Sequence, residues 1–202
     1  MYLPNHFAET DPARLHAAIE SYSFATLISG ADAELVASHL PLLLDRGAGP
    51  FGTLVGHMAR ANDQWQAAAR KPVLAIFTGP HAYVSPAWYE DQDVVPTWNY
   101  VAVHAYGTLA TIEDAVELAQ IVSRTVRYYE SRRDHPWKFD ERAEYAQRLL
   151  PHIVGFRIPI ERLEGKWKLS QNHSPARRQK VAQALAASER EDDRSIAGLM
   201  GR

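Results

Sequence analysis

The spacing of hydrophobic and polar positions divides the chain into a strand-rich middle flanked by helices. Between residues 24 and 109, short apolar runs alternate with Gly, Asp and Pro, and such closely spaced runs are typical of antiparallel strands. We expect strands at 24–29, 34–44, 51–58, 73–77, 82–85, 97–109 and 153–160. A turn at Gly79 and Pro80 should separate two of them, and Pro159 favours a sheet edge or a bulge.

Capping residues mark where helices begin. Asp11 can accept from the amides of a first turn, and Pro12 loses no donor at the first helical position. Thr111, with Asp114 three positions later, resembles a capping box before residues at helical spacing. We expect helices at 11–22, 62–69, 111–129 and 140–150, and a helical tail from 175. Central strands with segregated helices predict an α+β barrel and not alternating βαβ units.

Composition and charge exclude several classes of protein. The chain contains no cysteine, which excludes disulfides, zinc-thiolate sites and a cysteine nucleophile. No run approaches the roughly 18 apolar residues of a membrane span, and the start lacks the features of a secretion signal. We therefore expect a soluble, cytoplasmic protein. Its formal net charge of -2 offers no general surface for DNA, so any contact with DNA would need a local patch. The basic cluster Arg177 to Lys180 is either such a patch or, as we favour, part of a solvated, charge-balanced helix.

Three segments could bind a ligand. Five aromatic residues fall within eighteen positions, and they would suit a planar heterocycle or fill a barrel wall: Tyr83, Trp88, Tyr89, Trp98 and Tyr100. Residues 56–62 join a strand to a helix, where Arg60 and free amides could hold a phosphate or Arg60 could simply face solvent. In 166–172, Lys168 could pair with a phosphate, or the segment is an ordinary strand end.

Other chemistries find less support. His39, His57, His81 and His104 lie on or beside expected strands, but they lack the i, i+2 or i, i+4 pairing of metal sites. We therefore favour roles in the core or in ligand contact over metal binding. The sequence has no G-x-S-x-G, P-loop or G-x-G-x-x-G motif, so hydrolase, nucleoside triphosphatase and Rossmann hypotheses lose their usual support.

Six ordered blocks resemble the PaiB-like family of FMN-binding negative transcriptional regulators. They are 1–7, 38–42, 56–62, 79–86 with Trp88 and Tyr89, 95–100 and 168–172. The resemblance implies an antiparallel split β-barrel with peripheral helices, of the FMN-binding type related in fold to pyridoxamine phosphate oxidases and flavin reductases. It implies a split-barrel domain over 1–172 and a helical C-terminal tail over 173–202.

The resemblance also implies FMN bound at a homodimer interface. Its contacts would come from Ser38, His39, Leu40, Pro41, His57, Met58, Arg60, Asn62, Tyr83, Trp98, Asn99, Lys168 and Gln171. By their chemistry, we expect Arg60 and Asn62 at the phosphate and Tyr83, Trp98 and Asn99 at the ring or its edge. Ser38 to Pro41 would line the flavin from a strand. Lys168 and Gln171 would approach from the last strand, of this chain or of the partner subunit.

Two functions remain open, since a fold does not establish a function. The protein is either a regulator whose flavin acts as a ligand or redox signal, or a flavin-dependent oxidoreductase passing hydride through the flavin. A haem- or metal-binding barrel using His39, His57 or His104 is a third possibility. We find no helix-turn-helix signature, so a regulatory role is implied by the family resemblance alone. No catalytic residue is assigned.

Overall fold

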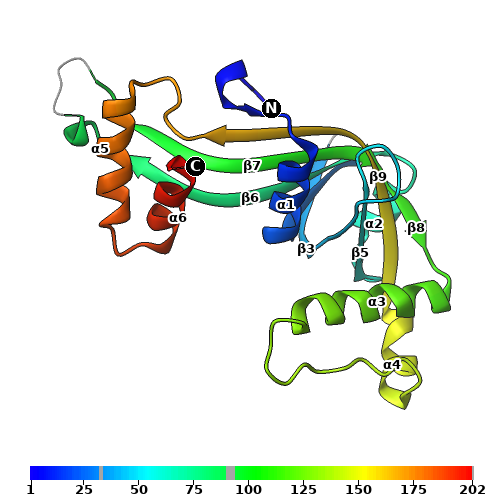
Figure 1. The fold of residues 1–202 in the computed structure, drawn as a ribbon. Helices are drawn as coiled ribbons and strands as arrows, with labels where there is room; N and C mark the ends of the chain where they lie inside the picture. Colours follow the sequence, from blue (N-terminus) through cyan, green and yellow to red (C-terminus); the bar gives the residue numbers. More distant parts are fainter. Residues whose placement is uncertain (32–33, 90–93, 202) are drawn as a thin grey trace. The chain divides into compact units, whose positions relative to one another are not determined.

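The computed structural model describes residues 1–31, 34–89 and 94–201 (Figure 1). Within those ranges the strands are β1 (Ala8–Glu9), β2 (Phe24–Ala31), β3 (Glu34–Pro41), β4 (Leu43–Asp45), β5 (Thr53–Ala59), β6 (Pro72–Val84), β7 (Thr97–Thr108), β8 (Ala110–Ile112) and β9 (Ile153–Lys168). The α-helices there are α1 (Pro12–Ser21), α2 (Gln64–Ala68), α3 (Ala115–Glu130), α4 (Glu144–Leu149), α5 (Pro175–Ala186) and α6 (Glu191–Met200). Three 3-10 turns accompany them, η1 (Asn5–Phe7), η2 (Pro86–Trp88) and η3 (Leu150–His152).

The strands form a largely antiparallel sheet. Their order is β3-β2-β6-β7-β9-β5-β4, with β1 and β8 each paired to β9. β2 and β3 pair along all eight positions, from Phe24 opposite Pro41 to Ala31 opposite Glu34. β5 pairs with β9 from Thr53 opposite Pro159 to Ala59 opposite Ile153. The predicted α+β class is confirmed.

The chain forms two compact units. Unit 1 comprises Met1–Ala18, Thr78–His104 and Glu164–Arg202, and unit 2 comprises Ile19–Phe77 and Ala105–Leu163. The strands β6, β7 and β9 contribute residues to both units.

The core of unit 2 is aliphatic and aromatic. Its fully buried side chains include Leu27, Leu42, Leu54, Met58, Phe77, Phe156 and Ile158. Each such burial contributes roughly 1.5–3 kcal/mol. Gly56 lies so close to this core that a Cβ there would be 2.7 Å from Leu42 Cδ2, and a side chain would push β5 away from it. Helix α3 begins where Asp114 accepts from the amide of Glu117 (2.9 Å), and it buries Leu118 and Ile121.

Unit 1 combines strand residues with the paired helices α5 and α6. Alternate residues of β7 are buried from Asn99 to Val103 in this unit, as the sequence pattern predicts. Helix α5 begins at the cap Ser174 and packs beside α6 (Figure 1). Their inner positions Val181, Leu185 and Ile196 are fully buried. The helices predicted from residue 175 onward are present as α5 and α6.

Several predicted boundaries were wrong. The strand expected at 34–44 is two strands, because fully buried Leu42 interrupts the ladder and its amide donates to the carbonyl of Ser23 (2.9 Å). No turn occurs at Gly79 and Pro80, since β6 runs through both. Both are buried there, and the alternation of buried residues shifts by one position. A proline has no amide hydrogen for the ladder, so this strand tolerates it at an irregular position.

Three further differences concern where elements begin and end. Thr111 does not cap a helix, because it lies in β8 opposite Phe156, and Asp114 takes the capping role. Strand β9 continues to Lys168, and Pro159 lies inside it at the end of the β5 ladder instead of on an edge strand. The helix expected at 140–150 is shorter, Glu144–Leu149, and continues as η3.

Candidate functional site

Ser38 and Asn62, predicted from separate segments, meet in unit 2. The side-chain amide of Asn62 donates to Ser38 Oγ (2.9 Å), while its Oδ1 accepts from the amide of Gln64 (3.0 Å). Gln64 in turn donates to the carbonyls of Leu27 and Val36, each at 3.1 Å. The connection from β5 to α2 is thus fixed against β2 and β3, with Asn62 at its centre.

The remaining β3 residues form an accessible strand surface. Every position of β3 is at least partly exposed, and β3 stands at one end of the strand order. His39 Nδ1 lies 3.1 Å from Thr26 Oγ1, and its ring stacks on exposed Phe24 with centroids 6.3 Å apart. Leu40 and Pro41 end the strand partly buried. A flat, partly apolar surface of this kind could lie against a ring or a second chain.

His57 and Met58 are adjacent on β5, but they differ in whether a polar atom is left for a ligand. Met58 is buried in the core of unit 2. The Nδ1 atom of His57 is buried and finds no hydrogen-bond partner among the described residues. Burial lowers the pKa of His57, so its ring is neutral at pH 7. A neutral imidazole with an unsatisfied nitrogen is the kind of group that a ligand completes.

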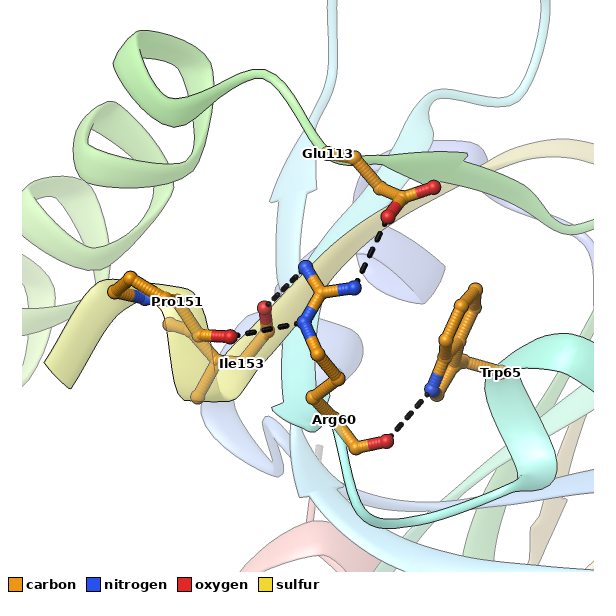
Figure 2. Close-up of polar contacts among 5 residues, drawn as sticks. All are labelled: Arg60, Trp65, Glu113, Pro151 and Ile153. Atoms are coloured by element: carbon orange, nitrogen blue, oxygen red, sulfur yellow. Dashed lines mark hydrogen bonds and ion pairs between the residues drawn. The ribbon is translucent and has the colours of Figure 1, made fainter.

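Arg60 is held within unit 2 (Figure 2). Its guanidinium donates to the carbonyls of Pro151 (2.9 Å) and Ile153 (3.3 Å) and pairs with Glu113 (3.0 Å). It lies over the ring of Trp65, whose indole nitrogen donates to the Arg60 carbonyl (3.0 Å). Helix α2 has only five residues, so its dipole adds little. A phosphate at Arg60 would have to share the guanidinium with Glu113.

In unit 1, Tyr83 and Trp98 form a surface pair. They are 43% and 48% exposed, and their rings meet edge to face with centroids 5.8 Å apart. The ring of His81 lies 6.1 Å from that of Trp98. These aromatic residues therefore do not fill the barrel wall, and their faces are open to a ligand or partner.

Asn99 and Gln171 have internal partners in unit 1. Asn99 is fully buried, and its Nδ2 donates to Ser170 Oγ at 3.0 Å. Gln171 donates to the carbonyl of Trp167 and accepts from the amide of Leu169, both at 2.6 Å. These bonds fix the turn after β9, where Ser170 has a φ of 63°. Both side chains position this turn.

Lys168 lines a small pocket of unit 1. It donates to the carbonyl of Trp98 (2.6 Å) and to the hydroxyl of Thr97. Burial and the nearby charge of Lys166 lower the pKa of Lys168. The pocket also includes Tyr89 of the aromatic segment, Arg177 of the basic cluster, and His173, which the sequence had not singled out. In the sequence, the one signal for this pocket was that the basic residue Arg177 follows closely after the turn at Ser170.

A second hollow in unit 2 was not predicted. A groove of about 570 Å³ lies beside Arg60 and is bordered by residues of α3, α4 and η3, among them Gln120, Gln147 and Leu150. Within the described ranges, no three His, Asp or Glu side chains are placed to hold a metal ion. No described helix combines the length and hydrophobicity needed to cross a bilayer.

The fold is that of the split-barrel flavin-binding proteins. The structure resembles the FAD and haem binding protein of Mycobacterium smegmatis, with a TM-score of 0.63 at 16% identity over 87% of this chain and 79% of that one. It resembles the flavocytochrome Anf3 of Azotobacter vinelandii with a TM-score of 0.62 at 11% identity, over 94% and 75% of the two chains. At such identities the likeness shows the fold alone.

Sequence comparison then gives the family. A family model described as "Putative FMN-binding domain" matches residues 1–162. The "Protease synthase and sporulation protein PAI 2" of Bacillus subtilis (strain 168) is 35% identical over 202 residues, covering 99% of this chain and 96% of that protein. The chain belongs to this PaiB-like family of FMN-binding proteins. The predicted family, split-barrel fold and FMN cofactor are confirmed.

Proposed function

We propose that the protein is a cytoplasmic regulator of the PaiB type that binds FMN at the interface of a homodimer. The observation that carries the site is the unsatisfied, buried Nδ1 of His57. It lies on β5, and part of β5 contacts β3, so Ser38 and His57 lie on two contacting, unpaired strands of one unit. Family membership supports FMN as the group that completes them.

The residues of unit 2 fit a flavin. Ser38 and Asn62 form a hydrogen-bonded pair that can donate to polar edges, and His57 adds a neutral nitrogen. Arg60 supplies the positive charge for a phosphate, which takes the place of Glu113 as the partner of the guanidinium. When bound, FMN supplies electron or hydride transfer, while the protein binds and orients it. With no cysteine in the chain, redox sensing would use the flavin and not thiols.

A second copy of the chain completes the proposed site. β3 is exposed along its length, and Leu35 on it is 81% exposed. An open edge strand with apolar side chains is a ready surface for another chain. In unit 1, the side chains of Tyr83 and Trp98, which the family resemblance implies at the ring, are about half exposed. Their exposure supports a role against the flavin or the partner.

FMN titration tests the proposal. We expect one FMN per chain, with a shift of its visible absorbance and quenching of its fluorescence on binding. His57→Phe should weaken binding by removing the ring nitrogen, whereas His16→Phe, in α1, serves as a substitution outside the site. No spectral change at any FMN concentration would refute the proposed function.

The proposed role as a regulator requires a separate experiment. Loaded protein should retard a specific promoter fragment over a scrambled one at physiological salt, and equal binding to both would contradict direct regulation. The basic cluster of the tail offers little to DNA, since Arg178 donates to the Met200 carbonyl (3.2 Å) and Arg177 lies over Tyr89. Rapid bleaching of bound FMN by NADH or NADPH would instead favour an oxidoreductase.

A further inference from the structure

The pocket beside Lys168 has the character of an anion site. It measures about 280 Å³ and lies wholly in unit 1, at the start of β7, the end of β9 and the start of α5. Lys168 and Arg177 bring two positive charges to it, while Phe7, Val95 and Pro96 give it an apolar wall. The described residues that line it include no Asp or Glu.

Two carboxylates among the described residues of unit 1 have partners of their own. Glu164 pairs with the amino group of Met1, and Asp192 lies 3.5 Å from His81 Nδ1. Lys168 uses two of its three donor positions on Thr97 and Trp98. One ammonium proton therefore remains for a ligand in the pocket.

Tyr89 supplies an independent observation. It is 4% exposed, yet its hydroxyl has no hydrogen-bond partner among the described residues. Arg177 lies 5.7 Å above its ring, and His173 lies 5.4 Å away on a tilted ring. Burial raises the pKa of Tyr89, so the phenol stays protonated and can donate. Buried hydroxyls are normally paired, and an unpaired one indicates a missing partner.

The pocket imposes a positive field on its own histidine. Burial, with the charges of Arg177 and Lys168, lowers the pKa of His173. A neutral His173 can donate one hydrogen bond to the ligand, and because it is uncharged it needs no anion of its own. The field, the free ammonium proton and the phenol all favour the same type of ligand.

We propose that this pocket binds the carboxylate or phosphate group of a small molecule other than FMN, whose planar or apolar body lies against Phe7 and Pro96. Arg177 and Lys168 neutralise the anion, and the Tyr89 hydroxyl donates to it. The bound ligand bridges the η2 turn and helix α5, two elements of unit 1 that already contact each other. The site requires no flavin. Lys168, expected from the family resemblance at FMN, would belong here instead.

Calorimetry with benzoate and inorganic phosphate tests the proposal. Benzoate carries a carboxylate on a planar ring, so it should bind one per chain and more tightly than phosphate. Arg177→Gln should weaken benzoate binding about tenfold, the equivalent of one charge-assisted hydrogen bond. Arg190→Gln removes the same charge from an exposed position of unit 1 and should leave the affinity within about twofold. Equal loss in both variants, or no binding of either probe, would overturn the site.

Tyr89→Phe separates ligand binding from folding. Removal of a buried unpaired hydroxyl should raise the thermal midpoint of the ligand-free protein, yet weaken benzoate binding about tenfold. Unchanged affinity would overturn the role of Tyr89. Benzoate should bind equally well with FMN present in excess, and competition between the two would assign the pocket to the flavin. Because the apo-protein measurements need no FMN, this proposal and the flavin site can fail separately.

Discussion

Arg60 serves three acceptors in its own unit, so a bound phosphate has to compete with Glu113. If the proposed anchor is correct, Arg60→Ala should weaken FMN binding about tenfold. Glu113→Gln should do the opposite, tightening FMN binding a few-fold by releasing the guanidinium. The exposed ion pair is worth less than about 1 kcal/mol, so unfolding of Glu113→Gln should change little. Titration of both variants checks this, and unchanged affinity in both would make Arg60 a purely structural residue.

His57 should give the fold a sensitivity to acid. Its pKa is lowered by burial, so the unfolded chain binds a proton near the ordinary value of about 6.5 while the folded chain resists it. The free energy of unfolding should therefore fall as the pH drops through about 6.5 and level off below the folded pKa. Urea unfolding of flavin-free protein should show a smaller drop in His57→Gln than in wild type. The same substitution at exposed His39 is the control.

Residue types were more predictable than residue partners. The sequence indicated that Arg60, Asn99 and Gln171 carry suitable groups for a flavin, which is a matter of side-chain chemistry. It could not show that Glu113, 53 positions from Arg60, takes part of the charge. Nor could it show that the side chain of Asn99 donates a hydrogen bond to Ser170, 71 positions away. Such partners follow from strand pairing, which local pattern does not specify.

At the scale of elements, the pairing of β7 with β9 depends on Gly107. A Cβ at this position would overlap the backbone carbonyl oxygen of Pro159, which cannot swing aside as a flexible side chain could. Gly107→Ala should therefore destabilise the protein by about 1–3 kcal/mol. Gly30→Ala in β2 is the matched control, since a Cβ there meets nothing within 4 Å. Chemical denaturation would contradict the prediction if the two variants were equally stable.

Element type was predicted well where spacing was regular, and element ends were not. The alternation of β7 and the helical spacing of α3 are local signals. The end of β9 is not local, because its last residues pair with β1, more than 150 positions away. Thr111 failed as a cap for the same reason. Its pairing with β9 outweighs the local preference of a threonine for a helix start.

At the scale of the whole molecule, the dimer proposal makes Leu35 an interface residue. Leu35→Glu should lower the fraction of dimer in light scattering and weaken FMN binding together. Leu149→Glu places the same charge at another exposed apolar position, at the end of α4, and should change neither. Because both side chains face solvent, both variants should fold. An intact dimer in Leu35→Glu would remove β3 from the interface.

The charge of the whole chain limits how it can meet DNA. A formal net charge of -2 gives no sequence-independent attraction to a polyanion. A regulator with this balance must act through a few well-placed contacts or through another protein. The promoter experiment distinguishes these routes, since a protein partner from cell extract would restore retardation that the pure protein lacks.

The interleaved composition of the two units has a practical consequence for taking the chain apart. Unit 1 is assembled from three separated stretches, and unit 2 fills both intervals between them. No single cut can release either unit as one continuous piece, and a gene fragment encoding 1–104 or 105–202 would contain parts of both. Fragment expression and domain exchange with relatives are thus poor tools for this protein, and point substitutions are the appropriate ones.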